Sequence, residues 1–205
     1  MAFIWDPRNI EIKTKSIHES LDPLVKNVTN LLTPQHAITQ KQRSKKSRKV
    51  VSAVESAIVT FGTIGKEIAR ENPGMRSEIN QCVDDVNEAG KVLLIKSQEF
   101  ADNPLDVGKR NLMVKAARNL LSNVTKLLLF ADYIDVQNLL KNVKRAEKYL
   151  GRIKHSHGND ELVDSMKKFQ KTSHNILHKT EQRWKDLLDP VYRKQLSDVS
   201  MVMTR

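Results

Sequence analysis

Several features are scarce in this sequence of 205 residues, and each scarcity narrows what the chain can be. Its single cysteine, Cys82, cannot form an internal disulfide, so we expect a reducing compartment. Seven glycines and six prolines are few for this length, while residues that favour helices fill long stretches, which predicts a helical protein. The longest apolar run, 127–131, is far shorter than the roughly 20 residues that cross a bilayer.

The start of the chain lacks the basic, then apolar, then small-residue order of a signal peptide, so we expect a soluble cytoplasmic protein. Basic residues outnumber acidic ones by 35 to 24, and the net charge of +11 should attract acidic partners, less strongly in salt. Charge alone leaves nucleic acid, anionic lipid and acidic protein segments open. Few aromatic residues and no recognisable nucleic-acid motif make nucleic acid the least expected of the three.

Groups that could perform catalysis or bind a metal are also missing. The sequence contains no glycine-rich phosphate loop and no Gly-x-Ser-x-Gly elbow. Cys82 lies on an apolar helical stripe, which favours a buried structural thiol over a nucleophile. His155 with His157, and His174 with His178, form close pairs, but no cysteine or acidic cluster completes a metal site. The sequence therefore predicts no enzyme, no cofactor and no metal ion.

Apolar residues recur at helical spacing along the first part of the chain. The first such stripe lies within 10–32 and contains Pro23, which removes a backbone hydrogen bond and predicts a break or kink near Asp22. A polar basic linker is expected over 33–49. A second helix is predicted over about 47–70.

A third helix is predicted over about 75–100, antiparallel to the second across a short turn. Residues 111–150 then contain neither glycine nor proline, and as one helix they would extend for roughly 60 Å. This helix is too long for one bundle, so its far half should support a second. A further helix is predicted over 159–188, and the start of another over 191–205. We expect an all-α fold of antiparallel helical bundles, two of four-helix type sharing one long helix, the second incomplete.

Several ordered motifs run through the chain: Trp5-Asp6-Pro7 with 10–14, 21–25 with Val28, Thr29 and Leu31, then 43–46, 100–104 and 109–128. Together they resemble the N-terminal region of the α-catenins, in the vinculin superfamily. The resemblance spans most of the chain, and residues 109–128 are its most specific part.

The resemblance implies a cell-adhesion adaptor module that binds β-catenin, or its plakoglobin-like relative, in a helix-in-groove mode. It also implies homodimerisation through an overlapping surface. The protein would be cytoplasmic, at adherens junctions on the inner face of the plasma membrane, and its membrane association would be peripheral, through the cadherin complex. Actin would be reached only through regions absent from this chain.

The implied domains are an extended segment at 1–15, a first bundle at 16–132 and a second, incomplete bundle at 133–205. The first would include the basic linker at 33–49 and carry both β-catenin binding and dimerisation.

An incomplete apolar layer on the helical hairpin gives a physical reason for two competing associations, because a partner's helix or a second copy could complete it. Periodicity places the shared face on these residues: Leu21, Leu24, Val25, Val28, Val51, Val54, Ile58, Phe61, Ile64, Ile79, Val83 and Val86. The alternative function is a basic helical module that binds anionic lipid or nucleic acid. In that function, the residues that contact the lipid or nucleic acid would be Lys45, Lys46, Arg48 and Lys49. The plainer interpretation of these four residues is a solvated linker.

Overall fold

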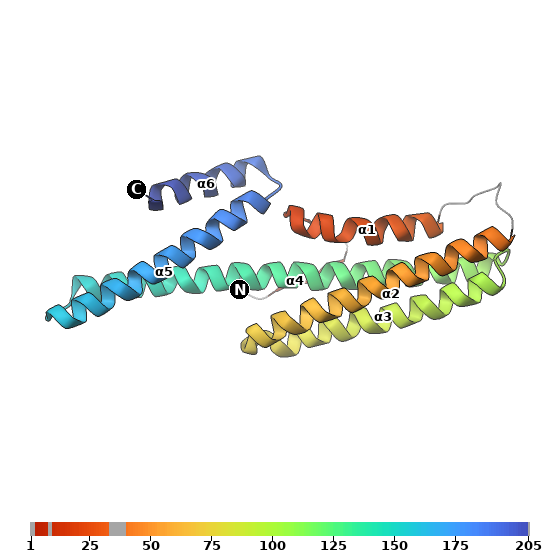
Figure 1. Ribbon diagram of the computed structural model, residues 1–205, viewed down its shortest axis with the longest axis horizontal. Coiled ribbons are helices and arrows are strands. Elements are labelled where there is room, and N and C mark those ends of the chain that lie inside the picture. The colour runs from red at the N-terminus through yellow and green to blue at the C-terminus, as the bar shows by residue number, and fades with distance from the viewer. Residues whose placement is uncertain (1–2, 8–9, 33–39, 205) are drawn as a thin grey trace. The chain divides into compact units, whose positions relative to one another are not determined.

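The structure is a computed structural model that describes residues 3–7, 10–32 and 40–204 (Figure 1). Its side chains are described except those of 30–32, 40–51, 53 and 204. The helices are α1 (Lys15–Leu32), α2 (Gln40–Glu71), the 3-10 helix η1 (Pro73–Met75), α3 (Arg76–Asp102), α4 (Val107–Lys154), α5 (Asn159–Asp186) and α6 (Pro190–Thr204). In these ranges one isolated bridge, between Thr14 and Leu187, is the only β pairing. The predicted all-α class is confirmed. None of the described helices is long and apolar enough to span a bilayer.

The chain divides into two compact units. Unit 1 consists of Met1–Ile12 and Ile17–Ala131, and unit 2 of Lys13–Ser16 and Asp132–Arg205. Helix α4 contributes to both units, because the division falls inside it. Its 48 residues extend for about 72 Å at the usual rise of an α-helix.

Helix α1 continues through Pro23, so the break near Asp22 is wrong, while the alternative of a kink there stays a prediction. An interior proline costs about 3 kcal/mol or more. Leu21 and Leu24, which flank Pro23, are both buried, and burying a leucine side chain contributes about 1.5–3 kcal/mol. Packing on both sides of the proline therefore offsets its cost and keeps α1 in one piece.

Helix α2 begins at Gln40, so the predicted start near Ser47 is wrong and residues 40–49 of the expected linker are helical. Residues 33–39 lie outside those that the structure describes. Glutamine, lysine and arginine have helix propensities close to that of alanine, and no glycine or proline interrupts this stretch. Apolar periodicity could not reveal these first turns of α2, because a stretch without apolar residues has no stripe to detect.

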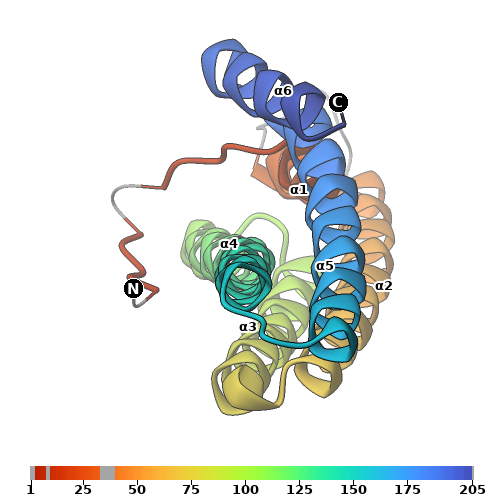
Figure 2. The same ribbon diagram turned by 90° about the vertical axis from the view of Figure 1, so that its left-hand side faces the viewer.

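The core of unit 1 lies along α2, α3 and the first part of α4. Figures 1 and 2 both show α2 and α3 side by side, and Figure 2 shows α1 and α3 on opposite sides of the unit. The buried apolar side chains of these three helices include Val54, Phe61, Ile79, Val83, Val86, Leu93, Met113, Ala117, Leu120, Val124 and Leu127. Their spacing of three, four and seven residues is that of one face on each helix.

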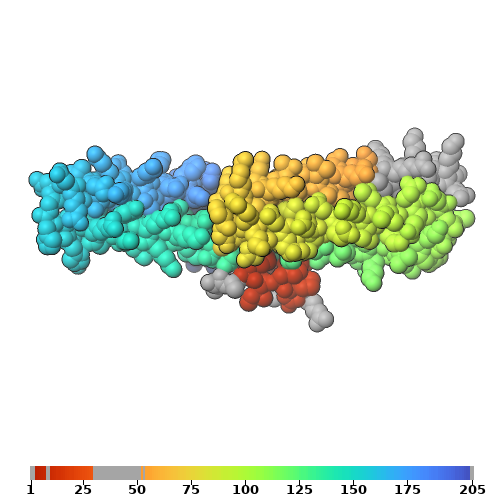
Figure 3. Space-filling model, turned by 90° about the horizontal axis from the view of Figure 1, so that it is seen from below, coloured from red at the N-terminus to blue at the C-terminus, as the bar shows by residue number. Residues whose placement is uncertain are grey.

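The N-terminal segment packs onto unit 1 through an aromatic pair. The rings of Phe3 and Phe130 lie with their centroids 4.8 Å apart, and Phe130 is buried. Figure 3 shows residues near the N-terminus, in red, lying against the surface of the unit. A tilted ring pair of this kind adds about 0.5–1.5 kcal/mol beyond its buried area, which favours the contact of this segment with α4.

Unit 2 buries far less. Its α5 and α6 pack against each other, yet among its described residues the buried apolar side chains are Ile134, Ala146 and Ile176. Many large apolar side chains of this unit remain exposed: Leu140, Leu150, Val163, Met166, Leu188, Val191, Tyr192, Val199, Met201, Val202 and Met203. The apolar layer of unit 2 is therefore only partly covered.

Two glycines let α2 and α3 approach each other closely. A Cβ atom added at Gly65 would overlap Cγ2 of Val83, and one added at Gly90 would overlap Cδ1 of Ile58. Valine has one strongly preferred rotamer in a helix, so Val83 cannot turn aside, whereas the end of an isoleucine side chain can. Gly65 is therefore the tighter of the two contacts.

We expect Gly65→Ala to lower the free energy of unfolding by about 1–3 kcal/mol, because the added methyl group forces α2 and α3 apart. The matched control is Gly151→Ala on α4, where an added Cβ meets nothing within 4 Å. That change should raise the free energy of unfolding by about 0.5–1 kcal/mol, since alanine favours helix over glycine. Urea unfolding followed by circular dichroism measures both, and equal effects would contradict the close packing.

Candidate functional site

The predicted partner face begins on α1, where three of its four residues are buried. Leu21, Leu24 and Val28 are spaced by three and four residues, so they lie on one side of the helix. Val25 lies on another side and is exposed. Helix α1 therefore packs into unit 1 through most of the predicted stripe.

On α2 the predicted residues differ in burial. Val54 and Phe61 are buried, Ile58 is half-buried and Ile64 is exposed. Ile64 thus lies at the edge of the face. Five of the predicted site residues have side chains that lie outside those the structure describes: Val51, Lys45, Lys46, Arg48 and Lys49.

The predicted residues of α3, Ile79, Val83 and Val86, are all buried. Val83 packs against α2 at Gly65, so the structure brings the α2 and α3 parts of the face together inside unit 1. A partner helix could reach these side chains only after a helix of unit 1 moved away. The α3 part of the predicted face therefore lies in the core of unit 1.

Other apolar side chains of the hairpin are reachable without any movement. Val59 on α2 is 67% exposed, and Ile95 and Val92 on α3 are 57% and 37% exposed. Sequence periodicity missed them, because it selects the inner stripe of each helix and leaves single outward apolar residues unassigned.

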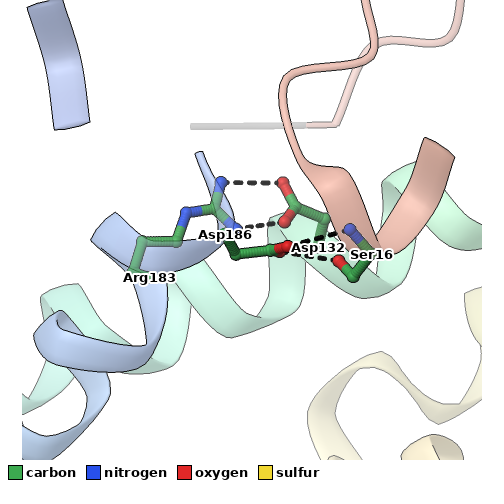
Figure 4. Close-up of polar contacts among 4 residues, drawn as sticks. All are labelled: Ser16, Asp132, Arg183 and Asp186. Atoms are coloured by element: carbon green, nitrogen blue, oxygen red, sulfur yellow. Dashed lines mark hydrogen bonds and ion pairs between the residues drawn. The ribbon is translucent and has the colours of Figure 1, made fainter. Parts of the chain in front are cut away.

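A polar clasp, formed by residues 13–16 with 183–188 and Asp132, holds the start of α1 (Figure 4). All of these residues belong to unit 2. The backbone N–H and the hydroxyl of Ser16 donate to the two carboxylate oxygens of Asp186, at 2.8 and 2.6 Å. Asp186 therefore caps α1 from a position 170 residues along the chain, and its negative charge suits the positive end of the helix dipole.

Backbone contacts complete the clasp. The N–H of Leu188 donates to the carbonyl of Lys13 at 2.9 Å, and the ammonium group of Lys15 donates to the carbonyl of Lys185 at 3.1 Å. Thr14 is fully buried between them. The segment before α1 is thus bound to the end of α5 by main-chain as well as side-chain bonds.

The carboxylate of Asp132 on α4 accepts two hydrogen bonds from the guanidinium group of Arg183. Burial opposes the positive charge, but the bonds to Asp132, its charge and that of nearby Asp186 outweigh burial and raise the pKa of Arg183. Arg183 therefore stays charged in its contact with Asp132.

In unit 1 the thiol of Cys82 is buried on α3. Burial raises its pKa, and the charge of Lys126 only partly offsets this effect. A thiol in this setting stays protonated at neutral pH, which makes it a poor nucleophile. This agrees with the structural role that the sequence predicts for Cys82.

The histidine pairs do not lie in metal-binding groups. Across the residues that the structure describes, no three His, Cys, Asp or Glu side chains converge on one point. Nδ1 of His155 lies 2.8 Å from the carbonyl oxygen of Gly151, and Nε2 of His178 lies 3.1 Å from the side-chain nitrogen of Gln182. Both histidines are engaged within their own helices.

We expect Asp186→Ala to loosen the start of α1, because Ser16 loses the acceptor for both of its hydrogen bonds. Removing a helix cap costs about 0.5–2 kcal/mol, which corresponds to a several-fold rise in the hydrogen-exchange rate of the first-turn amides. Asp198→Ala, which removes an exposed carboxylate from α6, is the control. If exchange in α1 is the same in both variants, Asp186 does not hold the helix.

Residues 11–203 match the Vinculin family. Catenin alpha of Drosophila melanogaster is 39% identical over 198 residues, which cover 96% of this chain and 22% of that protein. Catenin alpha-2 of Homo sapiens is 36% identical over 196 residues, which cover 94% of this chain and 21% of that protein. The chain therefore spans about a fifth of the length of the curated relatives it matches.

Two solved structures share the fold. A chain in the crystal structure of the HMP-1-HMP-2 complex aligns with a TM-score of 0.74 at 20% identity, covering 93% of this chain and 77% of that one. A vinculin homologue from a sponge aligns with a TM-score of 0.70 at 15% identity, covering 93% of this chain and 24% of that one. At these identities the likeness is one of fold.

Proposed function

Because this chain belongs to the vinculin family, we propose that it acts as an α-catenin-type adhesion adaptor module that binds β-catenin. The observation that supports this most is the 39% identity to a catenin alpha over 96% of the chain. In this role the module works in the cytoplasm at adherens junctions and reaches the membrane through the cadherin complex. Linkage to actin would require parts of a longer protein, since this chain corresponds to 22% of that relative.

The proposed binding mode is a helix that enters a groove. An amphipathic helix of β-catenin replaces α1 and packs its apolar face where Leu21, Leu24 and Val28 of α1 now lie, toward Phe61 of α2. The apolar area that α1 loses on leaving is regained against the partner, so the exchange is close to balanced. A modest difference in fit then decides which helix occupies the groove.

The same face serves a second copy of the chain in this proposal. A hairpin from another protomer offers the same apolar stripe and can complete the layer in place of the partner's helix. Dimer formation and β-catenin binding would then exclude each other, because both require the side chains around Phe61.

We expect Ile64→Asp to weaken binding of a β-catenin N-terminal helical peptide at least about tenfold, because it places a carboxylate in an apolar contact. Ile64 is already exposed, so the free module should still fold. Val59→Asp, on the same helix but outside the proposed face, is the matched control and should leave the affinity unchanged. Isothermal titration calorimetry measures both.

Two results would contradict the proposed face: equal losses in both variants, or no loss in either. Ile58→Asp tests a half-buried position of the same face, and circular dichroism of the free variant separates weaker binding from unfolding.

We also expect added peptide to convert dimers into one-to-one complexes. Light scattering across a peptide titration should show the dimer mass declining as the complex forms. If the dimer persists with the peptide bound to each copy, the two associations use separate surfaces and the competition is refuted.

A further inference from the structure

Five basic side chains lie along one side of the second half of α4, and we call them the cationic stripe: Lys141, Lys144, Arg145, Lys148 and Arg152. All five are exposed. With about 100° of rotation per residue, they fall within an arc of roughly 100°. Ala146, the buried residue of this stretch, points well away from that arc. The stripe is therefore a straight row of cations on the outward side of the helix.

The charge of the stripe is not balanced locally. Residues 136–154 contain six basic side chains and one acidic side chain, Glu147. None of the five stripe cations pairs with a carboxylate in the part of the chain that the structure describes. Like charges three or four residues apart repel each other and weaken a helix. The stability of α4 therefore does not account for the row, which is available to an acidic surface.

We propose that the cationic stripe binds the surface of a bilayer that contains anionic phospholipids. The five cations stand exposed along one side of a single helix. Lipid headgroups need no cleft, because they diffuse within the leaflet and gather beneath fixed cations. Clusters of four to eight basic residues on a helix are the usual footprint of such binding.

The side chains at the two edges of the stripe suit the same surface. Leu140 is exposed at one edge. At the other edge lies Tyr149, with the guanidinium carbon of Arg152 5.9 Å from the centre of its ring. An apolar group and an aromatic ring beside cations can enter the headgroup region while the charges meet the phosphates.

This surface is independent of the proposed β-catenin face, which lies on α1, α2 and α3. Each basic residue close to an anionic leaflet strengthens binding by roughly fivefold, so five of them give a contact that is weak singly and substantial together. The contact should weaken steeply as salt is raised, because exposed charges are screened within about 10 Å at moderate ionic strength.

The test is co-sedimentation of the 205-residue chain with phosphatidylserine-containing vesicles, and with phosphatidylcholine vesicles as the neutral reference. The stripe variant carries Lys141→Glu, Lys144→Glu and Lys148→Glu. The control variant carries Lys66→Glu, Lys115→Glu and Arg118→Glu, three exposed positions in unit 1. Both variants change the net charge by the same amount, so a difference between them reports position and not total charge.

We expect the stripe variant to lose at least about tenfold in partitioning to the anionic vesicles, and the control variant to retain most of it. Equal losses would overturn the proposal in favour of attraction by net charge. Circular dichroism of each variant confirms that the helices remain.

Two further arms separate the competing explanations. A third variant, with Lys45, Lys46, Arg48 and Lys49 changed to Glu, tests the other basic run of the sequence. If this variant loses vesicle binding and the stripe variant does not, the lipid contact lies on α2 and the stripe is excluded. If the wild-type chain ignores anionic vesicles but binds a polyglutamate peptide through the stripe, the partner is an acidic protein segment and the lipid proposal is wrong.

Discussion

The apolar stripe of α4 is the constraint on which the rest of the structure depends. Met113, Ala117, Leu120 and Val124 are fully buried in unit 1, and Ile134 continues the burial into unit 2. Because one unbroken helix carries both halves of this stripe, each unit can be built by packing shorter helices on it. In the second half of the helix the exposed positions include the five cations of the stripe.

Helix α1 is held by two contributions of unequal size. Burial of four apolar side chains, Ile17, Leu21, Leu24 and Val28, contributes about 1.5–3 kcal/mol each, as an upper estimate, while the cap from Asp186 contributes about 0.5–2 kcal/mol. Packing therefore dominates. A partner that displaces α1 has to bring an apolar face of its own. A change at the clasp alters the stability of packed α1 by less than the loss of its apolar contacts would. The tight contact of Gly65 with Val83 keeps α2 and α3 together during such an exchange.

Most of the helices could be predicted from sequence, and the failures have specific causes. The spacing of apolar residues located α3, α4, α5 and α6 to within a few residues, because each of these helices presents an apolar side to its neighbours. The same signal failed at the start of α2, where the residues are polar on every side. At Pro23 the apolar spacing indicated one continuous helix, and the expectation of a break came from the proline alone, whose local cost is outweighed by burial on either side.

The candidate face was predictable as a set of apolar positions but not in its accessibility. Val25 and Ile64 fit the periodicity as well as Leu24 and Phe61 do, yet the first two are exposed and the last two are buried. Burial depends on which helices pack on which side, and spacing within one helix carries no information about its neighbours.

The sequence by itself determined the helices, their apolar sides and the unbalanced row of charge on α4, because these follow from residues a few positions apart. Only the tertiary structure decided that Asp186 caps Ser16 and that glycines allow α2 and α3 to meet closely. Those contacts join residues that are distant in the chain, as far as 170 positions for the cap, and they exist only once folding has brought them together.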